Sequence, residues 1–135
     1  MFNHIMAKLG KNGAEIKLQL PKDDYAPGEQ ISAKVVVKGG KIKQTINQIT
    51  VDFVRGLSSA VAGEKQVIDS IPLVRTKFSI AEREEKTIPF IYTIPAALDW
   101  DEDESEFYFI ANLDIEAAID DHERRKIVIS PAAAN

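Results

Sequence analysis

Residues 107–115 read Phe107-Tyr-Phe-Ile-Ala-Asn-Leu-Asp-Ile115, and this stretch decides the fold class. Every second residue from Phe107 to Ile115 is apolar, whereas polar Asn112 and Asp114 lie between the apolar ones. Successive side chains of a β-strand point to opposite faces of its sheet. The period of two therefore predicts a strand with one buried face and one face toward solvent.

The same alternation recurs along the chain and predicts six further strands. Their inward-facing residues are Ile16, Leu18 and Leu20; Ile31, Ala33, Val35 and Val37; Ile49, Val51 and Phe53; Val74, Phe78 and Ile80; Ile88, Phe90, Tyr92 and Ile94; and Ile127 and Ile129. About seven short strands separated by turn signals are typical of an antiparallel sandwich rather than a parallel sheet with crossover helices. The predicted fold is all-β.

Turn-forming residues separate these strands. Pro27-Gly28 suits the two central positions of a type II turn, which need negative and then positive φ. Gly39-Gly40 ends the second strand, and the charged run 82–86 predicts a reversal before the fifth. Asp120-Asp121 tolerates a turn before the seventh.

We expect one domain over residues 1–135, because single domains run roughly 100 to 200 residues. Within residues 1–12, Phe2, Ile5, Met6 and Leu9 fall on one face of a helix that would stop near Gly10. This short helix is interpreted as a plug on one end of the sandwich, or as a hook for a membrane or partner. Residues 131–135 are expected to form a loose tail.

The composition is that of a water-soluble domain, with 44% hydrophobic and 28% charged residues. The absence of cysteine excludes disulfides and thiolate metal clusters, and fits a reducing compartment. No apolar run has the length of a transmembrane segment, and the N-terminus lacks the pattern of a signal peptide. We therefore expect a cytoplasmic protein. No basic stripe with interleaved aromatics indicates nucleic-acid binding.

No catalytic constellation emerges from the sequence, so we expect a protein that is not an enzyme. Nucleophilic catalysis requires an activated Ser, Thr or Cys beside a base, but His4 and His122 are the only histidines. The run Gly56-Leu-Ser-Ser-Ala60 lacks the second glycine and the strand-to-helix context of a nucleophile elbow. His122 lies in an acidic turn, where a metal site is the alternative to a solvated turn.

The sharpest local feature is an acidic segment, which holds six of the 21 acidic residues within 99–106. We predict partner binding by Trp100, Asp101, Glu102, Asp103 and Glu104. An aromatic side chain in such a loop either packs on the sandwich or contacts a partner. The alternative is a calcium site at Asp99, Asp101 and Asp103, since alternate aspartates can converge oxygen ligands on one ion. The segment departs from an EF-hand loop, because Glu104 stands where that loop has a glycine.

The chain also resembles the N-terminal arrestin-like domain of the SpoOM (sporulation-control) family. The stretches that carry the resemblance are 2–10, Tyr25-Ala-Pro-Gly-Glu29, Lys38-Gly-Gly-Lys41 with 44–49, Lys86-Thr-Ile-Pro-Phe90 with Ile94-Pro95, and Leu113-Asp-Ile115 with Ala118 and Asp120. Together they cover nearly the whole chain in order. The resemblance implies an arrestin-like, immunoglobulin-like β-sandwich and an intracellular regulatory or scaffolding role. It also implies family members with a second domain, and it supplies no catalytic residue.

Two functions follow as hypotheses. The first is a protein-interaction module that binds a partner, or a second copy of itself, by strand addition at a sheet edge. The acidic segment would favour a basic partner and speed the encounter, and outward-facing Val36 and Val54 indicate covered surface. The second is a calcium-dependent, C2-like module that uses the acidic segment 99–106.

Overall fold

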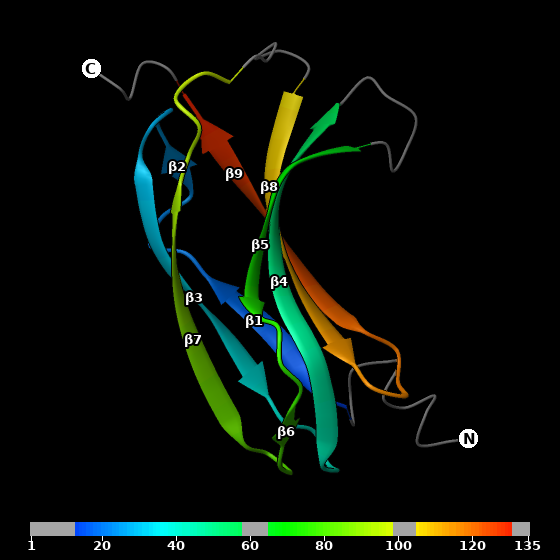
Figure 1. The fold of residues 1–135 in the computed structure, drawn as a ribbon. Coiled ribbons are helices and arrows are strands. Elements are labelled where there is room, and N and C mark those ends of the chain that lie inside the picture. Colours follow the sequence, from blue (N-terminus) through cyan, green and yellow to red (C-terminus); the bar gives the residue numbers. More distant parts are fainter. Residues whose placement is uncertain (1–12, 58–64, 99–104, 131–135) are drawn as a thin grey trace.

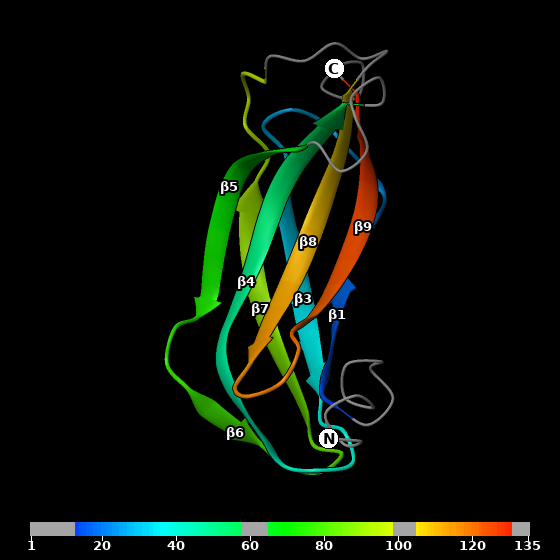
Figure 2. The ribbon, with the colours of Figure 1, turned by 90° about the vertical axis from the view of Figure 1, so that its right-hand side faces the viewer.

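Nine strands form two facing sheets in the computed structural model, which describes residues 13–57, 65–98 and 105–130 (Figures 1 and 2). The smaller sheet has the strand order β1-β3-β7, and the larger has β2-β9-β8-β4-β5, with β6 also paired to β4. The strands are β1 (Glu15–Gln19), β2 (Asp24–Tyr25), β3 (Gln30–Lys38), β4 (Gln44–Leu57), β5 (Lys65–Val74), β6 (Phe78–Ile80), β7 (Glu85–Thr93), β8 (Ser105–Ile115) and β9 (Asp121–Ile129).

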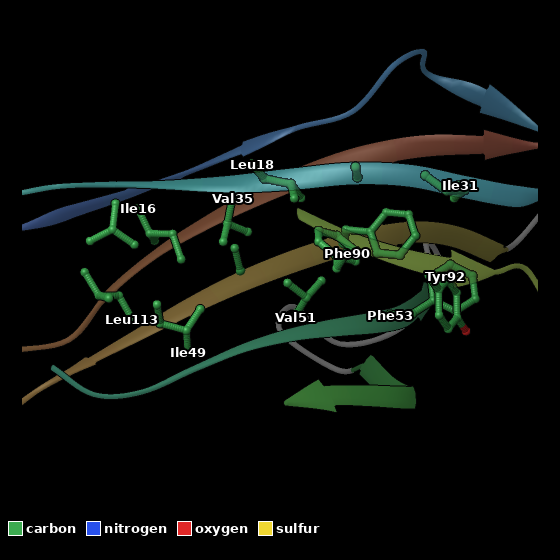
Figure 3. Close-up of a cluster of buried hydrophobic side chains, with 14 of the residues drawn as sticks. Ile16, Leu18, Ile31, Val35, Ile49, Val51, Phe53, Phe90, Tyr92 and Leu113 are labelled. Carbon is green, nitrogen blue, oxygen red and sulfur yellow. The ribbon is translucent and has the colours of Figure 1, made fainter. Parts of the chain in front are cut away.

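The core between the sheets is built from the alternate residues that the sequence marks as inward-facing (Figure 3). Its aromatic part joins both sheets, because Phe53 of β4 lies 5.5 Å from Tyr92 of β7 and 5.2 Å from Phe109 of β8, between ring centroids. Tyr92 meets Phe109 edge-on at 5.8 Å. Such tilted and edge-to-face pairs stabilise a core beyond the area that they bury. The prediction of an all-β fold is confirmed, and the described residues form a sandwich of two sheets.

Two details of the predicted strands are wrong. Val74, Phe78 and Ile80 do not share one strand, because β5 ends at Val74 and β6 begins at Phe78 after a bend. The prediction also missed β5 itself, whose register against β4 shifts twice. A bulge places two residues opposite one and so breaks the period of two on which the prediction rested.

Strand count and direction also differ from the expectation. Nine strands replace about seven, because the two-residue β2 is too short to show alternation and the predicted fourth strand is divided between β5 and β6. The pairing is antiparallel throughout the described sheets except between β2 and β9, which run parallel and pair Asp24 with Val128. The pairing of such distant segments is set by packing, and local sequence does not encode it.

The predicted turn at Pro27-Gly28 is confirmed. Gly28 has a φ of 84°, and the N–H of Glu29 donates to the C=O of Ala26 at 3.0 Å, which closes the turn. The carboxylate of Glu29 also accepts from the N–H of Ala26 at 2.9 Å and pairs with Lys22 at 2.6 Å. These contacts fix the entry to β3.

The predicted helix within residues 1–12 and the loose tail at 131–135 lie outside the described residues. Within the part of the chain that the structure does describe, no helix is long and apolar enough to cross a membrane.

Candidate functional site

The acidic segment falls largely outside the described residues. Trp100, Asp101, Glu102, Asp103 and Glu104, predicted to bind a partner, all lie within 99–104. The same holds for the calcium ligands predicted at Asp99, Asp101 and Asp103. Both hypotheses remain predictions.

Glu106 is the described member of the acidic segment, and it is tied to its own sheet. Its carboxylate accepts a short hydrogen bond from the hydroxyl of Tyr108 and pairs with Lys126 at 3.3 Å. The Tyr108 hydroxyl, followed by Lys126, holds the pKa of Glu106 below its ordinary value. Arg124 lies 4.7 Å from the centroid of the Tyr108 ring and completes this outward-facing cluster. The negative charge of Glu106 is thereby compensated by Lys126 within its own sheet.

His122 lies on the exposed outward face of β9, opposite Asn112 of β8. Among residues 13–57, 65–98 and 105–130, no three His, Cys, Asp or Glu side chains are grouped so as to hold a metal ion. Thr50, Asp52 and Asn112 form a hydrogen-bonded ladder on the same outward face, where Asn112 donates to Thr50 and Asp52 at 3.2 Å each. Ser70 donates to Asp52 at 2.7 Å, so the carboxylate is held by two neighbouring strands.

The strands at the ends of the two sheets are the remaining candidates, because unpaired strand edges recruit other chains. The three-residue β6, which pairs only with β4, adds a short fifth edge among the described strands. The edge of β1 is closed by side chains of β9. Ile16 N–H donates to Asp121 Oδ2 at 2.9 Å, and Leu18 N–H donates to Glu123 Oε1 at 3.0 Å. Arg125 Nη1 donates to Leu18 C=O at 3.1 Å. Alternate side chains of β9 thus take the place of a neighbouring strand.

The two ends of the larger sheet offer little regular edge. β2 has only two residues, and a very short edge strand gives few groups to pair with. β5 carries two register shifts against β4, one near Phe53 and Val54 and the other near Ile49 and Thr50. It also contains Pro72, which has no N–H to donate. Bulges and proline in edge strands prevent natural sheets from pairing with strands of other chains.

The edge of β7 is the regular one. β7 pairs with β3 without a register shift over the whole span from Glu85 to Thr93. No described strand pairs with its other side. Just beyond the ends of β7, Ile94 N–H donates to Glu29 C=O at 2.8 Å, and Glu84 C=O accepts from Gly39 N–H at 2.6 Å. Main-chain groups of successive residues alternate in direction, so even-numbered residues bond to β3 and odd-numbered ones face the free edge.

This alternation places Thr87, Pro89, Ile91 and Thr93 at the free edge, with side chains on the outward face. Pro89 has no N–H, and it fits here because the missing donor would have faced away from β3. Ile91 is 63% exposed, the largest exposed fraction among the large hydrophobic side chains of the described residues. The half of β7 that follows Pro89 therefore presents main-chain groups that pair with no described strand, beside an exposed apolar side chain.

A hydrogen bond between the sheets lies near this edge. The hydroxyl of Tyr92 in β7 donates to Asp69 Oδ2 in β5 at 2.5 Å. Burial, and then the contact with Asp69, raises the pKa of the Tyr92 hydroxyl above its ordinary value. The bond fixes β7 from its inward face and leaves its outward edge free.

The outward-facing valines do not add to an exposed surface. Val36 is 7% exposed and Val54 is 1% exposed, although neither belongs to the core between the sheets. Their cross-strand partners are Lys17 and Thr87 for Val36, and Val67 and Tyr108 for Val54. Val36 and Val54 are therefore covered within the chain itself, so they give no support to the interpretation that a partner covers them.

Comparison with protein families gives one assignment. The family described as SpoOM protein matches residues 2–135. The sporulation-control protein spo0M of Bacillus subtilis is 31% identical over 140 residues, which cover 99% of this chain and 54% of that protein.

Solved structures agree with this match. The crystal structure of the Bacillus subtilis protein Spo0M superposes with a TM-score of 0.77 at 29% identity, over 88% of this chain and 50% of that one. A CARDB domain from Pyrococcus furiosus, solved in complex with di-metal ions, gives a TM-score of 0.52 at 14% identity over 87% of each chain, which shows likeness of fold alone. The chain spans about half the length of the Bacillus relative.

Proposed function

The chain belongs to the SpoOM protein family, and from this premise we propose that it is an arrestin-like interaction module that binds an extended segment of a partner protein along β7. The binding mode is strand addition, in which main-chain hydrogen bonds supply affinity and side-chain contacts supply specificity. The proposal includes a regulatory scaffold role in the cytoplasm, without catalysis. A membership shared with a sporulation-control protein supports a regulatory role.

The observation that carries the proposal is that the edges of the two sheets differ in how many unpaired main-chain groups they offer in a regular series. β1 is closed by Asp121, Glu123 and Arg125, whereas β7 keeps a regular register and its odd-numbered main-chain groups have no partner strand among the described residues. An incoming strand would bond to Ile91 and Thr93, and its side chains would meet the exposed Ile91 on the outward face. Pro89 limits the added strand to one half of β7, which favours a short segment and disfavours open-ended stacking of copies.

The test is affinity capture from a lysate of the source cell, performed once with calcium and once with a chelator. Three baits are compared: the wild-type chain, Ile91→Pro and the matched control Ile91→Val. Proline at position 91 removes an N–H that faces the free edge, and leaves the bonds to β3 in place. We expect the wild type and Ile91→Val to retain the same discrete protein in both conditions, and Ile91→Pro to retain about tenfold less.

Amide hydrogen exchange on the captured complex gives a second readout. Partner binding should protect the amides of Ile91 and Thr93, and leave the already bonded amides of Phe90 and Tyr92 unchanged. Equal capture by Ile91→Pro, with a folded variant confirmed by circular dichroism, would rule out the β7 edge. Capture that depends on calcium would transfer the binding role to the acidic segment 99–106.

A further inference from the structure

A small pocket of about 200 Å³ is lined by residues of the turn after β3 and of the turn before β7. These two turns lie at the same end of the sandwich (Figures 1 and 2). Gly13, Gly39 and Gly40 contribute main chain to its wall. Pockets for drug-sized ligands measure about 300 to 1,000 Å³, so this one suits a small ion or a single chemical group. At Gly39 the missing side chain reflects the packing of the two turns, because a Cβ atom there would lie 2.1 Å from the main-chain oxygen of Ala81.

The remaining lining is charged and mostly basic. Lys38, Lys41 and Arg83 supply three cations, and Glu15 supplies one carboxylate. Glu85 lies opposite Lys38 in the register of β7. Nevertheless, none of the three cations is within ion-pair distance of a carboxylate in the described part of the chain. The described lining of the pocket carries three positive charges and one negative charge. Glu15 and Glu85 both lie opposite Lys38 in register, so Arg83 and Lys41 are the cations without a carboxylate directly across from them.

The main chain fixes the two turns that carry these exposed cationic side chains. Gly39 N–H donates to Glu84 C=O at 2.6 Å, and Arg83 N–H donates to Gly40 C=O at 3.0 Å, so the two turns are bonded to each other. Arg83 has a φ of 57°, a left-handed conformation that is uncommon outside glycine. Ala117 in the β8–β9 turn shares this conformation, so the strain alone indicates no site. At Arg83 it coincides with a basic pocket, and strained residues are frequent at binding sites.

We propose that this pocket binds an oxyanion of the phosphate class, held by the Arg83 guanidinium and the Lys38 and Lys41 ammonium groups. The planar guanidinium presents paired N–H donors that match two oxygens of a phosphoryl group. The two lysines add charge without demanding a fixed geometry. Glu15 borders the site and weakens its hold on any anion. The proposal does not depend on strand addition at β7.

The test uses the full chain, labelled with nitrogen-15, and follows the amide chemical shifts of Gly39, Gly40 and Arg83. Two probes are titrated separately: inorganic phosphate and a short phosphoserine peptide. Sodium chloride at matched ionic strength is the reference. We expect saturable shifts at these three amides with at least one phosphate probe and none with chloride. The probe that binds more tightly identifies the source as free phosphate or a phosphate monoester.

Variants show whether the phosphate probes bind in the pocket. Arg83→Asn keeps a residue that tolerates the left-handed conformation and should weaken binding by about tenfold. Arg75→Asn removes the same charge outside the pocket and should leave binding unchanged. Glu15→Gln removes the one carboxylate that the described residues contribute to the lining and should strengthen binding severalfold. A response to neither probe, or an equal response in Arg83→Asn, overturns the proposal.

Discussion

At the scale of single residues, Gly39 shows how a turn between distant segments depends on one missing side chain. A Cβ atom at this position would lie 2.1 Å from the main-chain oxygen of Ala81, and 3.1 Å from the nitrogens of Arg83 and Glu84. No rotation of a side chain relieves a contact with main-chain atoms, so the turns would have to separate. The hydrogen bond between Gly39 and Glu84 would then lengthen.

We predict that Gly39→Ala lowers the free energy of unfolding by about 2 kcal/mol, because overpacking of this kind costs roughly 1–3 kcal/mol. Gly28→Ala is the comparison. Its added Cβ would meet only Ala96 at an ordinary 3.7 Å, and its cost comes from the positive φ, at roughly 1 kcal/mol. Urea unfolding of the two variants measures the difference. A smaller loss for Gly39→Ala than for Gly28→Ala would contradict the close approach.

The sequence indicated a turn at both glycines, but it revealed the physical reason for a glycine at only one of them. Pro27-Gly28 encodes its turn locally, since proline and glycine set the two central φ angles themselves. Gly39-Gly40 only indicated the end of a strand. The atom that excludes a side chain at Gly39 belongs to Ala81, which is brought there by the pairing of β3 with β7. Long-range pairing of this kind leaves no mark near the glycine.

At the scale of elements, β9 acts as a strand and as a cover for the edge of β1. Glu123 Oε1 accepts from Leu18 N–H at 3.0 Å, and its carboxylate also pairs with Lys17 at 3.5 Å. We predict that Glu123→Ala lowers the free energy of unfolding by about 1–3 kcal/mol, since it leaves a partly buried N–H without its acceptor. Glu123→Gln keeps an oxygen at the same place and should lose less than half as much.

The measurement is urea unfolding combined with hydrogen exchange at the amide of Leu18. Faster exchange in Glu123→Ala, with wild-type exchange at Val35 in the centre of β3, would localise the effect to the edge. If Glu123→Gln and Glu123→Ala lost equal stability, the hydrogen bond to β1 would not be the cause.

The strands with the clearest alternation were predicted correctly, and the exceptions have physical causes. The inward face of β9 holds Asp121, Glu123 and Arg125 before Ile127 and Ile129. Only the last two positions are therefore apolar, and the sequence revealed only the end of this strand. The bulges of β5 had the same effect on its pattern.

At the scale of the whole molecule, the sequence predicted that an edge would matter but not which one. Edge identity follows from the order of strands in each sheet, and neighbours such as β3 and β7 are far apart in the chain. The available signal was proline, because Pro72 and Pro89 fall in strands and proline is confined to edges and bulges. Both indeed lie in end strands. The site predicted at 99–104 lies outside the described residues and is a separate question.

Pro89 therefore has a role that can be tested in the intact chain, as a barrier to self-association. Without it, the free edge of β7 would offer N–H groups at Thr87, position 89, Ile91 and Thr93 in one regular series. A long, regular edge with an exposed apolar side chain is a template for pairing with a second copy. We predict that Pro89→Thr shifts the chain toward dimers or larger assemblies as its concentration rises. The effect should be measured by analytical ultracentrifugation.

Pro72→Thr is the matched control. It also restores one N–H at an end strand, but the register shifts of β5 remain and prevent a regular ladder. We expect Pro72→Thr to sediment like the wild type at concentrations where Pro89→Thr associates. Adding Ile91→Lys to Pro89→Thr should reverse the association, because a charge on the edge repels a second copy. Equal association by both proline variants would show that proline, rather than regular register, governs these edges, and β7 would lose its distinction as the interaction edge.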